Sequence, residues 1–406
     1  MAILIGRRFV RIVVVVACLA LGVFLGVGEH SPLQRATKNT EPTADLLQLA
    51  SSAAVSMLRD RFLCLVDGDT SRLTENYGRS TASGDWAWER EVYRVEYFRD
   101  WASKRGVIIV EADSEFEIDA VSSQGDGSVW IEVTELACYS YVYADDEMGP
   151  KFTFGSRAVH AMEVQEADGR WVISMDWYLD PLGESCCITA SEAGEPDSCD
   201  VQTYWATGSD ALHGVWPMSP LTIASNRLDA EESRPRFNRS AAVQYALAHS
   251  GVRSIEGAGK YNSAYRTYTY AGGDCASFVS QVLHAGGMEQ GYGWYYTTEG
   301  STAWVRSDGL VWYLLSSGRG ETLYRGKFAK AVESTKEHPQ GIVSALELGD
   351  VIAYETRGEI SHVAVVVGKD PRGYVTIASH TADRLYFPWD LGWDRDTVYW
   401  LITITY

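Results

Sequence analysis

Hydrophobic residues recur at steps of three and four positions in the first part of the chain. This spacing predicts an amphipathic helix from Asp45 to about Val66. Its apolar positions are Leu46, Leu49, Ala50, Ala53 and Met57. A second helical pattern covers Glu89–Lys104, and Gly106 is expected to end it.

The period then changes to two residues, which is typical of strands with one buried face. The alternating apolar positions are Phe116, Ile118 and Ala120, then Val129, Ile131 and Val133, then Trp171, Ile173, Met175 and Trp177. Helices followed by strands predict an α+β domain. The order resembles the cone-like curved antiparallel sheet of nuclear-transport-factor-like domains, at the level of pattern. His160 lies in a strand pattern without a partner motif, so we expect a structural histidine with satisfied hydrogen bonds.

Composition shifts divide the chain into five segments. We expect a leader at 1–28, a polar tether at 29–43, the first α+β domain at 44–181, a linker at 182–237 and a second domain at 238–406. The linker is rich in Gly, Ser, Pro, Asp and Glu.

The leader has the features of an export signal. Arg7, Arg8 and Arg11 precede the uncharged run from Ile12 to Gly28, an order typical of signal peptides. Cleavage before Glu29 and an uncleaved membrane anchor through residues 12–28 both remain open. Either way we expect the chain to be secreted or to face the outside of the membrane or cell wall.

Charge and cysteine content narrow the function classes. The chain has 406 residues and a net charge of −19, which argues against nucleic acid as a partner. Export permits disulfides. The pairings left open are Cys199 with either Cys186 or Cys187, and Cys64 with Cys138. No HExxH or CxxC motif occurs, so we expect neither a metal site nor a cofactor.

The strongest candidate for chemistry is Cys275. A helix is expected to begin near Asn238 and to end at Gly251, and another follows from Asp274 to Ala285. Asp274 is a suitable N-cap, which places Cys275 at the first helical position. There the unpaired N–H groups favour a thiolate and could bind an oxyanion. Asp274 opposes this effect with its own negative charge.

Two histidines downstream could complete the site. His362 opens an apolar strand, and His380 ends the next one after a turn at 369–373. Pro371, midway between them, lies in that turn, so a regular hairpin would place the two histidines opposite each other on one face. One imidazole could then accept the thiol proton while the other orients it. A one-residue bulge would move His380 to the other face.

Several stretches together resemble a bacterial "putative amidase domain" family over about Phe237–Tyr406. They are Asn238-Arg-Ser-Ala-Ala-Val, Gly273-Asp-Cys-Ala-Ser-Phe-Val-Ser-Gln, Gly349-Asp-Val-Ile, His362-Val-Ala-Val-Val and Ser379-His-Thr381. The family is similar to NlpC-type and CHAP-type cysteine peptidases. The resemblance implies a papain-like α+β fold acting on amide bonds.

Site residues follow from this resemblance by position. It implies Cys275 as nucleophile, His362 as base and His380 as the third residue, with Asp383 as an alternative orienter. It further suggests an oxyanion-hole hydroxyl from Tyr265 or Tyr270. Ala276-Ser277 stand where the family often has Thr-Asn. The aromatic residues expected either to border the cleft or to fill the core are Trp294, Tyr295, Tyr296 and Trp304.

The sequence therefore predicts an exported cysteine amidase or peptidase whose substrate is cell-wall peptide. Two alternatives remain open: a non-catalytic surface module of the same shape, and an auxiliary amidase domain beside a ligand-binding N-terminal domain.

Overall fold

The computed structural model describes residues 44–182, 237–254, 257–269 and 271–406. The leader, the tether and nearly all of the linker therefore lie outside the described residues, as do Cys18, Cys186, Cys187, Cys199 and Tyr270. Within the described ranges, no helix combines the length and apolar character that crossing a membrane requires.

The N-terminal half consists of helices followed by long strands, as the periodicity predicts. The helices are α2 (Ala44–Asp67), α3 (Ser71–Asn76) and α4 (Ala82–Lys104). The strands are β1 (Val107–Ser123), β2 (Val129–Tyr143), β3 (Phe152–Ala167) and β4 (Arg170–Trp177). Helix α4 begins earlier than expected because the Thr81 hydroxyl accepts a hydrogen bond from the Gly84 amide at 3.1 Å and caps it.

The C-terminal half begins with helices and ends with strands. Its helices are α5 (Arg239–His249), α6 (Cys275–Ala285), α7 (Thr302–Val305), α8 (Ser307–Ser316), α9 (Phe328–Ala331) and the 3₁₀ helix η3 (Ile342–Ala345). Its strands are β5 (Arg253–Ser254), β6 (Gly257–Ala258), β7 (Gly320–Gly326), β8 (Val351–Thr356), β9 (Glu359–Lys369), β10 (Val375–Ser379), β11 (Asp383–Pro388) and β12 (Val398–Ile404).

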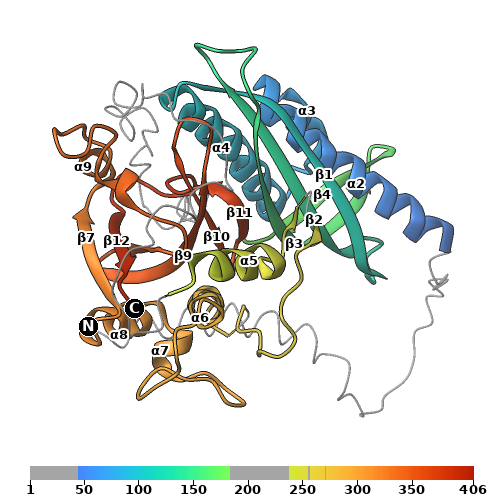
Figure 1. The fold of residues 1–406 in the computed structure, drawn as a ribbon. Helices are drawn as coiled ribbons and strands as arrows, with labels where there is room; N and C mark the ends of the chain where they lie inside the picture. Colours follow the sequence, from blue (N-terminus) through green and yellow to red (C-terminus); the bar gives the residue numbers. More distant parts are fainter. Residues whose placement is uncertain (1–43, 183–236, 255–256, 270) are drawn as a thin grey trace. The chain divides into compact units, whose positions relative to one another are not determined.

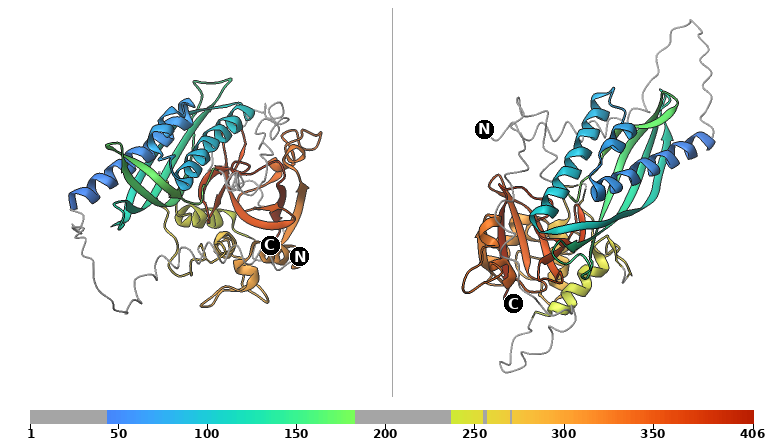
Figure 2. Two further views of the ribbon diagram at one scale, coloured as in Figure 1. Left: turned by 180° about the vertical axis from the view of Figure 1, so that it is seen from behind. Right: turned by 90° about the horizontal axis from the view of Figure 1, so that it is seen from above.

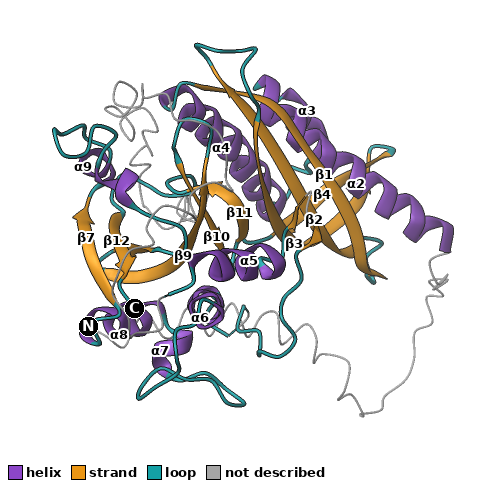
Figure 3. Cartoon of the chain, viewed as in Figure 1, coloured by secondary structure: helices purple, strands orange, loops and turns teal. Residues whose placement is uncertain are grey.

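One antiparallel sheet of ten strands runs through both halves (Figures 1 and 3). Its order is β1-β2-β3-β11-β10-β9-β8-β12-β7, and β4 pairs with a later part of β3, on the edge opposite β2. The halves meet where β3 pairs with β11, with Arg157 opposite Asp383. The chain thus has the expected α+β character, and the two expected domains share a single sheet.

The sheet separates two hydrophobic cores. Helices α2 and α4 lie along strands β1–β4 (Figure 2, right), and their core extends to Ala364 and Val366 of β9. Val363, Val365 and Val367 of the same strand belong to a second core with residues of α5, α6 and α8. Because side chains alternate along a strand, register alone decides which face each residue of β9 joins.

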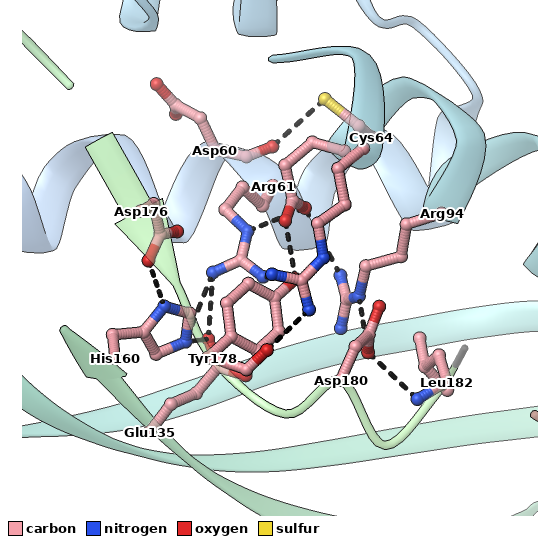
Figure 4. A network of polar contacts seen from close by, with 12 residues as sticks. Asp60, Arg61, Cys64, Arg94, Glu135, His160, Asp176, Tyr178, Asp180 and Leu182 are labelled. Atoms are coloured by element: carbon pink, nitrogen blue, oxygen red, sulfur yellow. Dashed lines mark hydrogen bonds and ion pairs between the residues drawn. The ribbon is translucent and has the colours of Figure 1, made fainter. Parts of the chain in front are cut away.

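A network of buried charges lies within the N-terminal half (Figure 4). The Arg61 guanidinium contacts Glu91 at 2.8 Å and Glu135 at 3.3 Å. His160 is fully buried and bonds Asp176 through Nδ1 at 2.8 Å, with Nε2 at 3.4 Å from Glu135. These contacts agree with the expectation of a satisfied structural histidine. Each charge has an opposite charge in contact, as buried charges require.

The pairing of Cys64 with Cys138, which the sequence leaves open, does not form. Cys64 is buried on α2, where its thiol donates to the Asp60 carbonyl at 3.1 Å. Cys138 is an exposed residue of β2, and neither forms a disulfide. Successive residues of a strand face opposite ways, and Tyr139, the residue after Cys138, packs against Phe98 of α4. Cys138 therefore points away from the helices.

The buried network predicts a specific loss of stability in acid. Burial raises the pKa of Glu135, but Arg61 and His160 outweigh burial and lower it to about 2. A carboxylate with a depressed pKa stabilises the fold above its unfolded pKa of ~4.5, and this contribution, roughly 3 kcal/mol, disappears as the pH falls toward 2. Urea unfolding between pH 5 and 2 should therefore show a shallower loss of unfolding free energy in Glu135→Gln than in the unaltered protein. If the unfolding free energies of the two proteins fell in parallel with pH, the lowered pKa of Glu135 would be contradicted.

Candidate functional site

Local sequence places Cys275 at the start of α6. Gly272 and Gly273 both have φ of +108°, a conformation that residues with a side chain rarely adopt. These glycines make the tight turn that the sequence predicts, and α6 begins directly at Cys275. Cys275 is buried, with only 6% of its surface exposed. Its thiol thus lies beside the N–H groups of the first helical turn, which have no partner within the helix.

Asp274 occupies the N-cap position but its side chain does not cap the helix. Instead, Oδ1 accepts from the Tyr268 amide at 3.0 Å and Oδ2 contacts Nδ1 of His380 at 2.7 Å. The Asp274 amide donates to the Thr381 hydroxyl at 2.5 Å. The residue before Cys275 is therefore joined to the turn that carries His380.

His380 is surrounded by hydrogen-bond acceptors. Its Nε2 lies 2.7 Å from the carbonyl of His249, the last residue of α5, while Nδ1 faces Asp274. A carbonyl can only accept, so the hydrogen bond to His249 uses a proton on Nε2. His380 is therefore held between the end of α5 and the residue that precedes Cys275.

His362 and His380 lie on opposite faces of the sheet, so the expected regular hairpin is wrong. Thr376 pairs with Gly368, but the next residue, Ile377, pairs with Val366. This one-residue bulge shifts the register and moves the side chains of β10 to the other face relative to β9. His380 consequently stacks on Phe278 of α6 with ring centroids 4.1 Å apart.

His362 lies away from Cys275. It is opposite Tyr354 in the sheet, and its ring lies 5.7 Å from that of Tyr354 and 5.5 Å from that of Trp393. Among the described residues its Nε2 has no hydrogen-bond partner. Burial, together with the nearby cation of Arg384, lowers its pKa well below the usual value for histidine. A neutral ring on the far face does not fit the expected role as base for Cys275.

Cys275 opens onto a groove of about 670 Å³. Its Sγ lies 3.3 Å from Oγ of Ser307, the first residue of α8. The starts of α6 and α8 therefore meet at the thiol, and both present the positive end of a helix. The Ser307 hydroxyl can donate to a thiolate at this distance.

Aromatic and charged side chains form the far wall of the groove. Trp312 is 60% exposed and meets Trp400 edge-on at 6.3 Å. Arg325 lies over the Trp400 ring at 4.3 Å, and Glu355 accepts from the Trp400 indole at 2.8 Å. Such a combination of apolar surface and a few fixed polar groups is typical of ligand sites.

The four aromatic residues expected near the cleft do not line this groove. Trp294 and Trp304 are fully buried and stack 4.8 Å apart, with the Trp294 indole donating to Ser280 of α6 at 3.0 Å. Tyr296 packs against Trp304 at 5.8 Å, while Tyr295 is 46% exposed. The cluster fixes α6 from behind, and the role of cleft aromatics falls to Trp312 and Trp400.

The remaining candidates have other contacts. Tyr265 stacks on Trp304 at 5.9 Å and does not line the groove, whereas Tyr268 does. Tyr270, the other expected oxyanion-hole residue, lies outside the described residues. Asp383 accepts from the Tyr261 hydroxyl at 2.6 Å and contacts Arg157 at 3.4 Å. It therefore approaches His380 through Tyr261.

Sequence reasoning missed Ser307 and Trp312. The pair Ser307-Asp308 was a readable signal for a helix start, but its meeting with Cys275 depends on tertiary packing. In the described part of the chain, no group of three or more His, Cys, Asp or Glu residues could hold a metal ion.

The contact between Cys275 and Ser307 predicts an effect on thiol reactivity. Cys275 should be alkylated by iodoacetamide at about pH 6, where an ordinary thiol with a pKa near 8.5 is mostly protonated. Ser307→Ala removes a donor to the thiolate and should slow alkylation severalfold. Ser316→Ala, at the other end of α8, is the matched control. Peptide mapping after timed labelling measures both, and equal rates in the two variants would exclude a role for the Ser307 hydroxyl.

A comparison with known protein families finds similarity in the C-terminal half of the chain. Residues 236–402 match the family model described as "Putative amidase domain". The uncharacterized protein YhbB of Bacillus subtilis (strain 168) is 30% identical over 176 residues, covering 40% of this chain. The chain spans 49% of that relative's length. The intermembrane space region of chloroplast protein ARC6 covers 32% of this chain and 95% of its own, at 14% identity and a TM-score of 0.24, too low to support an argument. The family match supports an amidase-like, hydrolytic function for residues 236–402.

Proposed function

We propose that the C-terminal half hydrolyses an amide bond and that Cys275 is the nucleophile. The observation that carries this proposal is the position of its thiol, at the start of α6, on a groove, and 3.3 Å from the Ser307 hydroxyl. A thiolate is the reactive form of cysteine, and helix starts favour it. The match to the amidase family agrees with this chemistry.

His380 is the proposed acid and base, in place of His362. It lies on the α6 face, and Asp274 orients its Nδ1 at 2.7 Å. Proton transfer requires one hydrogen bond of the ring to open. The bond from Nε2 to the uncharged His249 carbonyl is weaker than a bond to a carboxylate, so we expect Nε2 to be released toward the thiol while Nδ1 stays on Asp274.

The reaction then has two steps. The Cys275 thiolate attacks the substrate carbonyl, and the first-turn N–H groups of α6 bind the developing oxyanion. His380 gives a proton to the leaving amine as the C–N bond breaks, leaving a thioester on Cys275. Water, deprotonated by His380, hydrolyses the thioester and returns the thiol.

We further propose that the substrate is cell-wall peptide and that the chain acts outside the cytosol. The support for export is the leader, in which Arg7, Arg8 and Arg11 precede an apolar run. The groove wall, which joins the Trp312–Trp400 pair to Arg325 and Glu355, offers both apolar and charged contacts to a peptide.

One alternative retains support from the structure. Both ring nitrogens of His380 are engaged, and His362 lies on the far face. A non-catalytic module that binds wall peptide in the same groove would have no need of a released imidazole.

Replacing Cys275 separates the two functions. Cys275→Ala should reduce hydrolysis of purified peptidoglycan to near background, measured by mass analysis of released fragments. Stability should change little, because Ala is a good helix residue and the side chain is small. Combining it with His380→Ala should add little further loss, because residues that act as one unit are not additive. Full activity in well-folded Cys275→Ala would exclude a cysteine mechanism. If neither the unaltered protein nor the variant hydrolysed the substrate and both bound peptide with the same affinity, the binding module would be favoured.

The groove wall predicts a binding defect without a chemical one. Trp312→Ala removes exposed aromatic surface that takes no part in breaking the bond, so KM should rise several-fold with little change in kcat. Trp177→Ala on β4 removes another half-exposed tryptophan (46%) and is the matched control. Steady-state kinetics on one defined peptide compares the two, and an unchanged KM in Trp312→Ala would remove this wall from the substrate site.

A further inference from the structure

The turn that follows His380 also leads to a contact with the N-terminal half. Thr381 and Ala382 have φ of +57° and +67°, values that are uncommon for residues other than glycine. Two such residues in succession between strands form a tight hairpin turn, with His380 before them and Asp383 after them. The Thr381 hydroxyl accepts from the Asp274 amide. The turn therefore holds His380 and Asp383 at fixed positions beside α6.

Asp383 connects this turn to β3. Its Oδ2 lies 3.4 Å from Nη1 of Arg157, the residue opposite it in the β3–β11 pairing. The Asp383 side chain is only 5% exposed, whereas that of Arg157 is 33% exposed. A nearly buried carboxylate needs an opposite charge or hydrogen-bond donors to remain ionised. Arg157 supplies the charge from the N-terminal half.

Tyr261 continues the link toward the site. Its hydroxyl donates to Oδ1 of Asp383 at 2.6 Å, and its ring stacks on His380, with centroids 3.9 Å apart and planes within 5°. Phe278 covers the other side of the imidazole at 4.1 Å. There is little room for movement here, because a Cβ on Gly251 would lie 2.6 Å from both Asp383 and Tyr261.

We propose that Arg157 is a positioning residue of the amidase site, acting through Asp383 and Tyr261 to hold the His380 ring in place beside Asp274. The inference rests on the function proposed above and assigns a task to the N-terminal half: its strand β3 completes the support of the site. The groups that face His380 are Asp274 from α6, Asp383 from β11, Tyr261, the His249 carbonyl from α5 and, beyond Asp383, Arg157 from β3.

Removing Arg157 should alter the site without removing any group that touches the substrate. Burial raises the pKa of Asp383, and His380 and Arg157 oppose that rise. In Arg157→Met, Asp383 should bind a proton at a higher pH than in the unaltered protein, so the anionic acceptor of the Tyr261 hydroxyl is lost earlier as the pH falls. We expect kcat to fall about 2- to 30-fold with KM unchanged, and the low-pH limb of the activity profile to move to higher pH.

Two readouts on the full chain test this inference. The first is the kcat and KM for peptidoglycan fragments across pH. The second is the pH dependence of Cys275 alkylation by iodoacetamide, which needs no turnover and responds to a nearby imidazolium. Arg157→Lys should keep most of the kcat and nearly the same alkylation profile. Arg170→Met, which changes an exposed arginine of β4 in the same sheet, should match the unaltered protein in both readouts.

A second variant covers the case in which Arg157→Met fails to fold. Tyr261→Phe keeps the ring over His380 and removes only the hydroxyl, so it should reproduce the Arg157→Met effects. The two changes combined should be less than additive if they act through one link. Folded Arg157→Met and Tyr261→Phe with unaltered kcat and alkylation profiles would overturn the inference. If the unaltered protein hydrolyses nothing, the proposed function fails, whereas the alkylation profiles still decide whether Arg157 acts on the site.

Discussion

A single extra residue in β9, Val367, decides which imidazole lies on the α6 face of the sheet. Side chains on a strand alternate between faces, so the bulge between Thr376 and Ile377 sends His380 to the α6 face and leaves His362 in the opposite core. The rest of the site follows from this choice. Asp274 contacts Nδ1 of His380, and Nε2 of the same ring donates to the carbonyl of His249, the last residue of α5.

Much of the scaffold could be predicted because its signals are local. The two glycines and Asp274 mark the start of α6, and Cys275 lies at the first helical position as expected. The long helices and alternating strands of the N-terminal half also follow from their periods. The bulge could not be predicted, because the run 363–367 is buried on both faces. An apolar run of this kind has no alternation to show which way His362 points.

The groove illustrates the second limit of sequence reasoning. The sequence leaves open whether Trp294 and Trp304 border the cleft or fill the core, because large aromatic side chains near a helix do either, and here they pack behind α6. Ser307 and Trp312 reach the groove because the start of α8 meets the start of α6, an arrangement determined by packing between distant segments. Asp274, whose charge opposes a thiolate, contacts a histidine more than a hundred positions away, which the sequence alone does not reveal.

The pairing of β3 with β11 also determines how the chain tolerates dissection. Three residue pairs join the strands, and the fully buried guanidinium of Arg384 donates to the carbonyl of Pro181 at 2.7 Å. Cutting the chain between its halves would leave a bare strand edge on each piece and a buried cation without its acceptor. Such edges pair with whatever strand is available, including the same edge of another copy. Dissecting the chain at the boundary that the sequence suggests would therefore create pieces prone to aggregation or strand exchange.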